Sequence, residues 1–306
     1  MPVDPLAPAI LVLLFFLSAV LAPALSKRFG FPPTLLCLVP GATFVVLLSG
    51  SGPVWQGAIP RASVPWAPEL GLAWDLWLSP AGLLLALLVS GMGTLVVIYA
   101  AAYLQGSDRL GRFLGILFLF SGSMMGIAVT ENALVLFVFW ELTSIASYLL
   151  IGHFHEKAES RKSALDALLI TAGGGVVLLA GFILLGEITG TYRIGGWIEA
   201  AETIRSHPLY AAAFLCIAFG AFTKSAQVPF HFWLPGAMAA PAPVSAYLHS
   251  ATMVKLGVFL LAILHPVLGG TPLWHDTLVG FGAVTMVWGA LVALVQTDLK
   301  RLLAFS

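Results

Sequence analysis

Three ionisable side chains lie inside long apolar runs of this 306-residue chain. Glu141 stands between FVFW and LTSIASYLL, and Lys224 and Lys255 are each placed within an apolar run. An ionisable group at the depth of a hydrocarbon core costs at least about 2.5 to 3.5 kcal/mol, so its presence there indicates a functional role. Carboxylates and amines hold and release protons, which makes proton movement the first chemistry to consider.

Glu141 and Lys224 are the pair whose chemistry is simplest to state. To exchange protons near neutral pH, a lysine must have its pKa lowered by about three units, or about 4 kcal/mol, which desolvation can supply. A glutamate within about 4 Å favours the charged lysine by about 4 kcal/mol at an effective dielectric constant of about 20. Because the two effects nearly cancel, movement of Glu141 toward or away from Lys224 would load or unload a proton. The simpler alternative is a buried ion pair that only holds helices together. With two lysines and one glutamate, one lysine would then have no acidic partner.

Lys224 lies in GAFTKSAQVPFHFWLPGAMAAPAPVSAYLHS, the most polar and proline-rich stretch within any apolar run. Pro229 has no N–H, so the carbonyl of Ser225 loses its helical partner, and Pro235 does the same to His231. The prolines therefore predict a broken helix beside Lys224. Free carbonyls at membrane depth are tolerated only where they face protein or a water-filled cavity. Transporters use such breaks for ion sites, whereas the simpler alternative is a plain proline kink.

The next apolar run carries His249 and Lys255. In an α-helix, six residues would separate them by about 9 Å along the axis and about 120° around it, so they would not share a stripe. A proton passing between them would need water or a residue from another helix. The alternative for His249 is a histidine with satisfied hydrogen bonds. Nearby hydroxyl groups give this run a polar wall: Ser245, Tyr247, Ser250 and Thr252.

The remaining polar features give weaker signals. His231 lies beside Pro229, and Asp166 lies near the end of an apolar run, where it can reach an interface. The GGG run at 173–175 is interpreted as close helix packing rather than a phosphate loop. The sequence contains no HExxH, paired-carboxylate or nucleophile motif, so no cofactor is expected and no metal site is assigned. Two cysteines inside apolar runs are expected to be small buried hydrophobes: Cys37 and Cys216.

Membrane-spanning helices must position these residues. Hydrophobic residues make up 59% of the chain and charged residues 9%, against about 25% in a soluble domain, which excludes an ordinary soluble protein. Fourteen Lys and Arg balance fourteen Asp and Glu, so no basic surface for nucleic acid is expected. We predict an all-α polytopic membrane protein with about nine full spans and the start of a tenth at Leu299, cut off as in a fragment of a longer protein. The predicted spans cover residues 6–25, 33–50, 78–103, 113–130, 133–152, 163–188, 208–228, 242–265 and 277–296.

Lysine and arginine residues are distributed unevenly between alternate loops. One set of loops holds nine: Lys27, Arg28, Arg109, Arg112, Lys157, Arg161, Lys162, Lys300 and Arg301. The opposite set holds three: Arg61, Arg193 and Arg205. The positive-inside rule then predicts that the nine face the cytoplasm and that the N-terminus lies outside.

Three strings resemble a known family: WELTSIASYLLIGH (140–153), PFHFWLPGAMAAPAPVSAYLHSATMVK (229–255) and QTDLKRLLAFS (296–306). They resemble the antiporter-like subunits shared by Mrp-type cation/proton antiporters and the membrane arm of respiratory complex I. They are more similar to the A-type subunit of the Mrp complex than to the L-type subunit of complex I. The resemblance runs over essentially the whole chain and is strongest from about residue 78 onward.

The resemblance implies two inverted five-helix repeats. Three N-terminal spans would occupy residues 1–112, the first repeat residues 113–265, and the start of a truncated second repeat residues 266–306. The seventh helix of the family is broken, as the prolines here predict independently. Two positions depart from the family pattern, because Ala239 replaces a usual acid and Ala242 a usual threonine.

The resemblance also implies a proton pathway, position by position. Glu141 matches the essential glutamate of the fifth helix and Lys224 the lysine of the broken seventh helix. His249 and Lys255 match a relay on the eighth helix, and Lys300 matches a lysine that links the two halves. Asp298, two residues before Lys300, is a weaker candidate.

The implied function is a subunit of a Na⁺(K⁺)/H⁺ antiporter in the bacterial plasma membrane, not an enzyme. It would work with other membrane subunits, protons and monovalent cations in a lipid bilayer. One alternative is a proton-pumping subunit of NADH:quinone oxidoreductase, whose redox chemistry resides in partner subunits. Another is a non-transporting assembly subunit, whose buried charges only fix helix order. No cluster of oxygen ligands for Na⁺ stands out, so the sequence does not identify the cation.

Overall fold

The computed structural model describes residues 6–28, 32–67, 69 and 72–306. The side chains of Lys27, Arg28, Trp66, Ala67 and Leu72 lie outside that description. Two of the nine basic residues used to predict orientation, Lys27 and Arg28, are therefore placed only by their backbone.

Seven stretches of helix in the described part of the chain are long and apolar enough to cross a membrane. They are α1 (Ala7–Arg28), α4 (Pro80–Tyr103), α5 (Leu110–Val129), α6 (Ala133–Ile151), α7 (Ala158–Thr189), a continuous stretch made of α12 (Ala242–Val244), η5 (Ser245–Thr252) and α13 (Lys255–Leu268), and α14 (Pro272–Leu294). Two further apolar helical segments are shorter, residues 33–49 and α10 (Tyr210–Lys224). Helices thus occur at all nine predicted positions, while the number that cross the membrane stays a prediction.

The segment at residues 33–49 consists of η1 (Pro33–Cys37) and α2 (Leu38–Ser49). The remaining helical segments are short: α3 (Ser51–Trp55), η3 (Gly152–Phe154), α8 (Ile194–Glu199), α9 (Ala201–Ser206), η4 (Phe230–Phe232), α11 (Trp233–Ala237) and α15 (Leu299–Phe305). The last of these begins at Leu299, where the sequence predicted a new helix.

Capping residues explain where several helices begin and end. Ser79 accepts a hydrogen bond from Gly82 N at the start of α4, and Thr271 accepts one from Trp274 N at the start of α14; a proline follows each cap. Asn132 caps α6 by accepting hydrogen bonds from two backbone N–H groups. Gly190 ends α7 with φ of 70°, a conformation that glycine adopts without a steric penalty.

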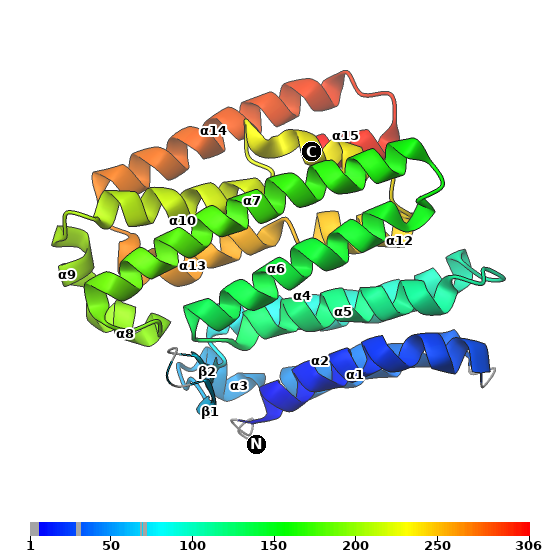
Figure 1. The fold of residues 1–306 in the computed structure, drawn as a ribbon, viewed down its shortest axis with the longest axis horizontal. Helices are drawn as coiled ribbons and strands as arrows, with labels where there is room; N and C mark the ends of the chain where they lie inside the picture. The colour runs from blue at the N-terminus through cyan, green and yellow to red at the C-terminus, as the bar shows by residue number, and fades with distance from the viewer. Residues whose placement is uncertain (1–5, 29–31, 68, 70–71) are drawn as a thin grey trace.

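The long helices lie side by side, from α1 and α2 at one edge to α14 at the other (Figure 1). Direct contacts join α1 to α5, α5 to α6, α6 to α7, α7 to α10 and α10 to α13. Most of α5 is buried, so it is a central helix, whereas α14 lies along the outer edge with most of its side chains exposed. This order places α6 between α5 and α7, and it brings α10 against α7 as well.

A β-hairpin corrects the all-α prediction. Strands β1 (Arg61–Ala67) and β2 (Leu72–Trp77) pair antiparallel, with Arg61 opposite Trp77 and Ser63 opposite Asp75. The segment lies in a predicted loop and is too short and too polar to read as a span. Valine and tryptophan favour strands, and the helical interpretation of the whole chain overlooked the ones in this segment.

Alternate loops meet one another, as the predicted topology requires. Arg109 after α4 forms an ion pair with Glu156 after α6. The hairpin and the loop before α8 meet at the other end of the bundle, where Arg61 and Arg193 both approach Glu131 (Figure 1). Which end faces the cytoplasm remains a prediction.

Candidate functional site

Lys224 is the last residue of α10, and its side chain is fully buried. Its Nζ donates hydrogen bonds to Ser144 Oγ at 2.7 Å and to the Trp140 carbonyl oxygen at 3.0 Å. The same Nζ lies 5.1 Å from the centroid of the Trp140 ring, a cation–π distance. All these partners belong to α6, so a lysine on one helix is held by neutral groups on another.

Glu141 follows Trp140 on α6 and precedes Ser144 by three residues, so it lies in the segment that holds Lys224. Its side chain is half-buried, and its Oε1 is buried without a hydrogen-bond partner in the described part of the chain. Glu141 and Lys224 interact electrostatically, yet no ion pair within 4.0 Å joins them there. The two groups are therefore neighbours held apart.

The helix breaks beside Lys224, as the prolines predicted. After α10 ends, Ala226 adopts φ of 52°, and Val228 N donates to Thr285 Oγ1 of α14 at 3.0 Å. Pro229 precedes the short turn η4, and Pro235 lies inside the five-residue helix α11. A lysine at the end of a broken helix, with irregular backbone beside it, is thus part of the structure.

His249 lies in η5, which is π-helical rather than α-helical. The predicted spacing of 9 Å and 120° to Lys255 assumed an α-helix, and η5 is not one, because its backbone bonds residue i to i+5. His249 is 7% exposed, and neither ring nitrogen has a hydrogen-bond partner among the described residues. The described residues therefore do not supply the hydrogen bonds that the alternative of a satisfied core histidine requires.

Lys255 is exposed, which corrects the prediction of a buried lysine. It lies at the first turn of α13, and its Nζ donates to the Ser250 carbonyl. That position faces a cavity of about 450 Å³ between the broken helix, η5, α14 and α15. Its lining includes Gln227, His231, His249, Lys255 and Thr285.

Trp233 connects the Lys224 site to His249. Its indole N–H donates to the carbonyl of Thr223, the residue before Lys224, at 3.0 Å. Its ring packs edge-on against the His249 ring, with centroids 6.0 Å apart. Lys224 and His249 are thus linked through one buried indole rather than by direct contact.

The other predicted residues are dispersed. Lys300 is half-buried and donates to the carbonyls of Ala240 at 2.8 Å and Met238 at 3.3 Å, and it interacts electrostatically with His249. His231 accepts a hydrogen bond from the Trp288 indole at 3.0 Å. Asp298 caps α15 by accepting from Arg301 N. Asp166 is exposed on α7, with no hydrogen bond or ion pair in the part of the chain that is described.

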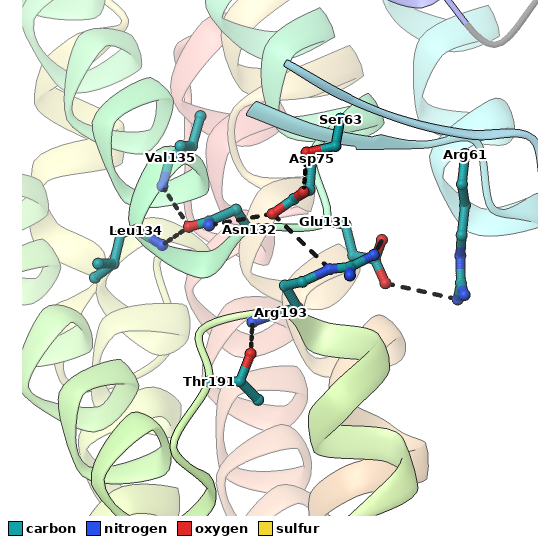
Figure 2. A network of polar contacts seen from close by, with 9 residues as sticks. All are labelled: Arg61, Ser63, Asp75, Glu131, Asn132, Leu134, Val135, Thr191 and Arg193. Atoms are coloured by element: carbon teal, nitrogen blue, oxygen red, sulfur yellow. Dashed lines mark hydrogen bonds and ion pairs between the residues drawn. The ribbon is translucent and has the colours of Figure 1, made fainter. Parts of the chain in front are cut away.

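A second polar cluster lies at the end of the bundle that carries the hairpin (Figure 2). Glu131, 1% exposed, receives Arg193 Nη2 at 3.2 Å and Arg61 Nη2 at 3.6 Å. Asp75 accepts from Ser63 Oγ at 2.7 Å and lies 3.9 Å from Arg193 Nε. We call the residues Arg61, Asp75, Glu131, Asn132 and Arg193 the hairpin-end network.

The hairpin-end network joins three distant segments to the start of α6. Asn132 donates to Asp75 Oδ2 at 3.4 Å while its Oδ1 accepts from the N–H groups of Leu134 and Val135. The hydrogen bond from Arg193 to Glu131 is the main cause that raises the pKa of Arg193 above its usual value. The network thus fixes the helix that carries Glu141 nine residues later.

Sequence reasoning missed Ser144 and most of the hairpin-end network. Glu131 lies between two apolar runs and reads as a loop residue, and Asp75 lies in a predicted loop. The only feature of the sequence that pointed to the hairpin-end network was the count of basic residues in alternate loops, which placed Arg61 and Arg193 on the same side. Within the described residues, no group of three His, Cys, Asp or Glu side chains could hold a metal ion.

A bundle of apolar helices around a buried lysine defines a polytopic helical membrane protein. Residues 130–306 match the family described as NADH:quinone oxidoreductase/Mrp antiporter, TM. This match covers more than half of the chain, which therefore belongs to that family.

Relatives and a solved structure agree with this assignment. The chain is 44% identical over 294 residues to the A-type subunit of the Na(+)/H(+) antiporter of Alkalihalophilus pseudofirmus, covering 95% of this chain and 36% of the relative. It is 46% identical over 253 residues to the A/B-type subunit of the probable K(+)/H(+) antiporter of Rhizobium meliloti, covering 83% of this chain and 25% of the relative. The Mrp complex from Dietzia sp. DQ12-45-1b aligns with a TM-score of 0.85 and 34% identity over 98% of this chain and 32% of that chain. The chain thus spans about a third or less of the length of these proteins.

Proposed function

We propose that this chain moves protons as part of a multi-subunit Na⁺(K⁺)/H⁺ antiporter in the bacterial plasma membrane. The observation that carries the proposal is Lys224, fully buried at a helix break and held by α6 beside Glu141. A buried amine held only by neutral acceptors is easily discharged, because no ion pair fixes its charge. Relatives named as Na⁺/H⁺ and K⁺/H⁺ antiporter subunits support the cation/proton exchange.

Lys224 would act as the proton carrier and Glu141 as the group that sets its charge. When Glu141 approaches, the charged lysine is favoured, and when Glu141 retreats, the proton leaves. The next acceptor along the proposed path is His249, which lines the polar cavity together with Lys255. Because the Trp233 indole between Lys224 and His249 only donates a hydrogen bond, water would have to carry the proton past it. Lys300, which interacts with His249, would carry the path onward.

The wider organisation follows from the same proposal. Residues 1–112 would form N-terminal spans, residues 113–265 the first antiporter repeat and residues 266–306 the start of a second. The N-terminus would face outside, and other membrane subunits would complete the complex. The exposed side chains along α14 support a neighbour on that side.

The test uses everted vesicles from antiporter-deficient cells that produce the complete complex. Glu141→Gln and Lys224→Ala are each expected to lower the dissipation of a respiration-generated pH gradient at least tenfold when NaCl or KCl is added. Glu187→Gln, an exposed glutamate on α7, is the matched control and is expected to behave like the unmodified protein. The salt that gives the larger response identifies the cation.

Two results would overturn the proposal. If Glu141→Gln and Lys224→Ala both showed normal antiport and unchanged complex abundance, the charges of Glu141 and Lys224 would have no more than a structural role. If deletion of this chain abolished NADH-driven proton pumping and left salt-dependent antiport unchanged, the chain would instead belong to a redox-linked pump.

A further inference from the structure

The three consecutive glycines of α7 meet three different surroundings. Gly173 is exposed, whereas Gly174 and Gly175 are buried. Close helix packing, the sequence interpretation of this run, therefore applies to two of the three. What each glycine faces decides what a side chain at that position would do.

Gly175 leaves the space that the Glu141 carboxylate fills. A Cβ atom at position 175 would overlap Glu141 Oε1 and would lie 2.9 Å from its Cδ and 3.4 Å from Trp140 Cδ1. The overlapping atom is the far end of a flexible side chain, so the carboxylate can move while the helices keep their places. This Oε1 is the buried atom that has no hydrogen-bond partner among the described residues.

Gly174 faces the other partner helix. A Cβ atom there would overlap Thr223 Oγ1 and lie 2.6 Å from Thr223 Cβ, next to the backbone of α10. A β-branched side chain is stiff about its first torsion, so relief requires movement of α10 itself. By contrast, a Cβ atom at position 173 would meet no atom within 4 Å.

We propose that Gly175 is a positioning residue that forms a notch in α7 for the Glu141 carboxylate and so sets its separation from Lys224. The inference rests on the proposed proton-carrying role of that pair. With the notch open, Glu141 lies against α7 while Lys224 bonds Ser144 and Trp140 on α6. A side chain at position 175 closes the notch and forces the carboxylate to a new distance from the lysine.

The size of the effect follows from Coulomb's law. A change in separation between about 6 and about 4 Å, at an effective dielectric constant of about 20, corresponds to about one pH unit in proton affinity. A merely structural glycine would change the amount of complex but not its pH profile. The pH dependence of transport therefore separates the two roles.

The experiment compares Gly175→Ala with Gly173→Ala in the complete complex in everted vesicles. Both changes add one methyl group to the same turn of the same helix and raise helix propensity equally. The rate of antiport is measured from pH 6 to pH 10, together with complex abundance. Gly175→Ala is expected to displace the half-maximal pH by about half a unit or more, whereas Gly173→Ala is expected to match the unmodified protein.

A double-variant cycle shows whether the displacement acts through Glu141. Aspartate is one methylene shorter, so Glu141→Asp withdraws the carboxylate from the notch and Gly175→Ala is expected to add little in that background. If Gly175→Ala alone fails to accumulate, recovery of abundance by Glu141→Asp supports the notch and no recovery overturns it. Matching profiles for Gly175→Ala and Gly173→Ala, or an equal displacement in both backgrounds, would also overturn it.

Glu141→Gln is included so that the two proposals fail differently. Normal antiport by Glu141→Gln refutes the proton-carrying role itself. Loss of antiport by Glu141→Gln, combined with matching profiles for the two glycine variants, refutes only the notch.

Discussion

Lys224 Nζ lies 2.7 Å from Ser144 Oγ, so a hydroxyl group on α6 holds the buried amine. Ser144 also has its Oγ 3.4 Å from the Trp140 carbonyl oxygen, the second acceptor of the lysine. A hydroxyl both accepts and donates, and it can therefore bond the charged and the neutral amine in turn.

Ser144→Ala is expected to move the pH profile of antiport toward lower pH by about one unit. A hydrogen bond to a charged group contributes about 1.5 to 3 kcal/mol, and its loss disfavours the charged form of the lysine. Ser147→Ala is the control, because Ser147 bonds the Ser144 carbonyl on the same helix without contacting Lys224. Equal profiles for the two variants, measured in everted vesicles, would contradict the assigned contact.

Arg193→Gln is expected to lower the stability of the complex by about 1 to 3 kcal/mol. The change removes the hydrogen bond to Glu131 and leaves that buried carboxylate with Arg61, at 3.6 Å, as its remaining cation. The exposure of half of the Arg193 side chain keeps the cost below that of a fully buried pair. Thermal unfolding measures it, with Arg112→Gln as the control because the exposed Arg112 side chain has no hydrogen bond or ion pair among the described residues.

Adding Glu131→Gln to Arg193→Gln extends this test. The double variant has no uncompensated carboxylate at position 131, so it is expected to recover part of the lost stability. A double variant that is less stable than either single one would show that Glu131 is held mainly by other groups.

Glu156→Gln is expected to shift the melting temperature by the same small amount at pH 5, 7 and 9. A hydrogen bond from Arg109 lowers the pKa of Glu156 from 4.5 to about 2. A depressed folded-state pKa means that the contribution is present above the ordinary value and lost only as pH falls toward 2. Salt screening, rather than mild acid, is thus expected to weaken this exposed pair. A difference that vanishes between pH 7 and pH 5 would contradict the low pKa.

Gly174→Ala is expected to reduce the amount of assembled complex, because the added Cβ meets Thr223 Cβ at 2.6 Å. Overpacking of this kind costs about 1 to 3 kcal/mol. Quantitative blotting of solubilised complex measures the loss, and Gly173→Ala again serves as the control. Equal abundance of the two variants would mean that α7 and α10 adjust without strain.

Local chemistry explains what the sequence could predict. Pro229 removes a backbone donor wherever it stands, so the break after Lys224 is visible without a fold. Charge inside an apolar run likewise marks Glu141 and Lys224 directly. Such features depend on the residue and its immediate neighbours, and they carry over to the folded chain.

Contacts between distant segments explain what the sequence did not predict. Ser144 meets Lys224 across eighty residues, and Asp75 meets Asn132 across fifty-seven, which no periodicity encodes. Lys255 reads as buried because its run is apolar, yet its exposure depends on which helix face turns toward the cavity. The π-helical turns of η5 set that face, and propensity does not predict them.

The π-helical segment η5 acts as a phase shift within one continuous helix. Before and within it, Tyr247 reaches Val89 and Ser121 in the buried interior. After it, Lys255 emerges on the exposed side of the same rod. The wider turns of η5 therefore let one continuous helix present Tyr247 to the buried interior and Lys255 to the exposed side.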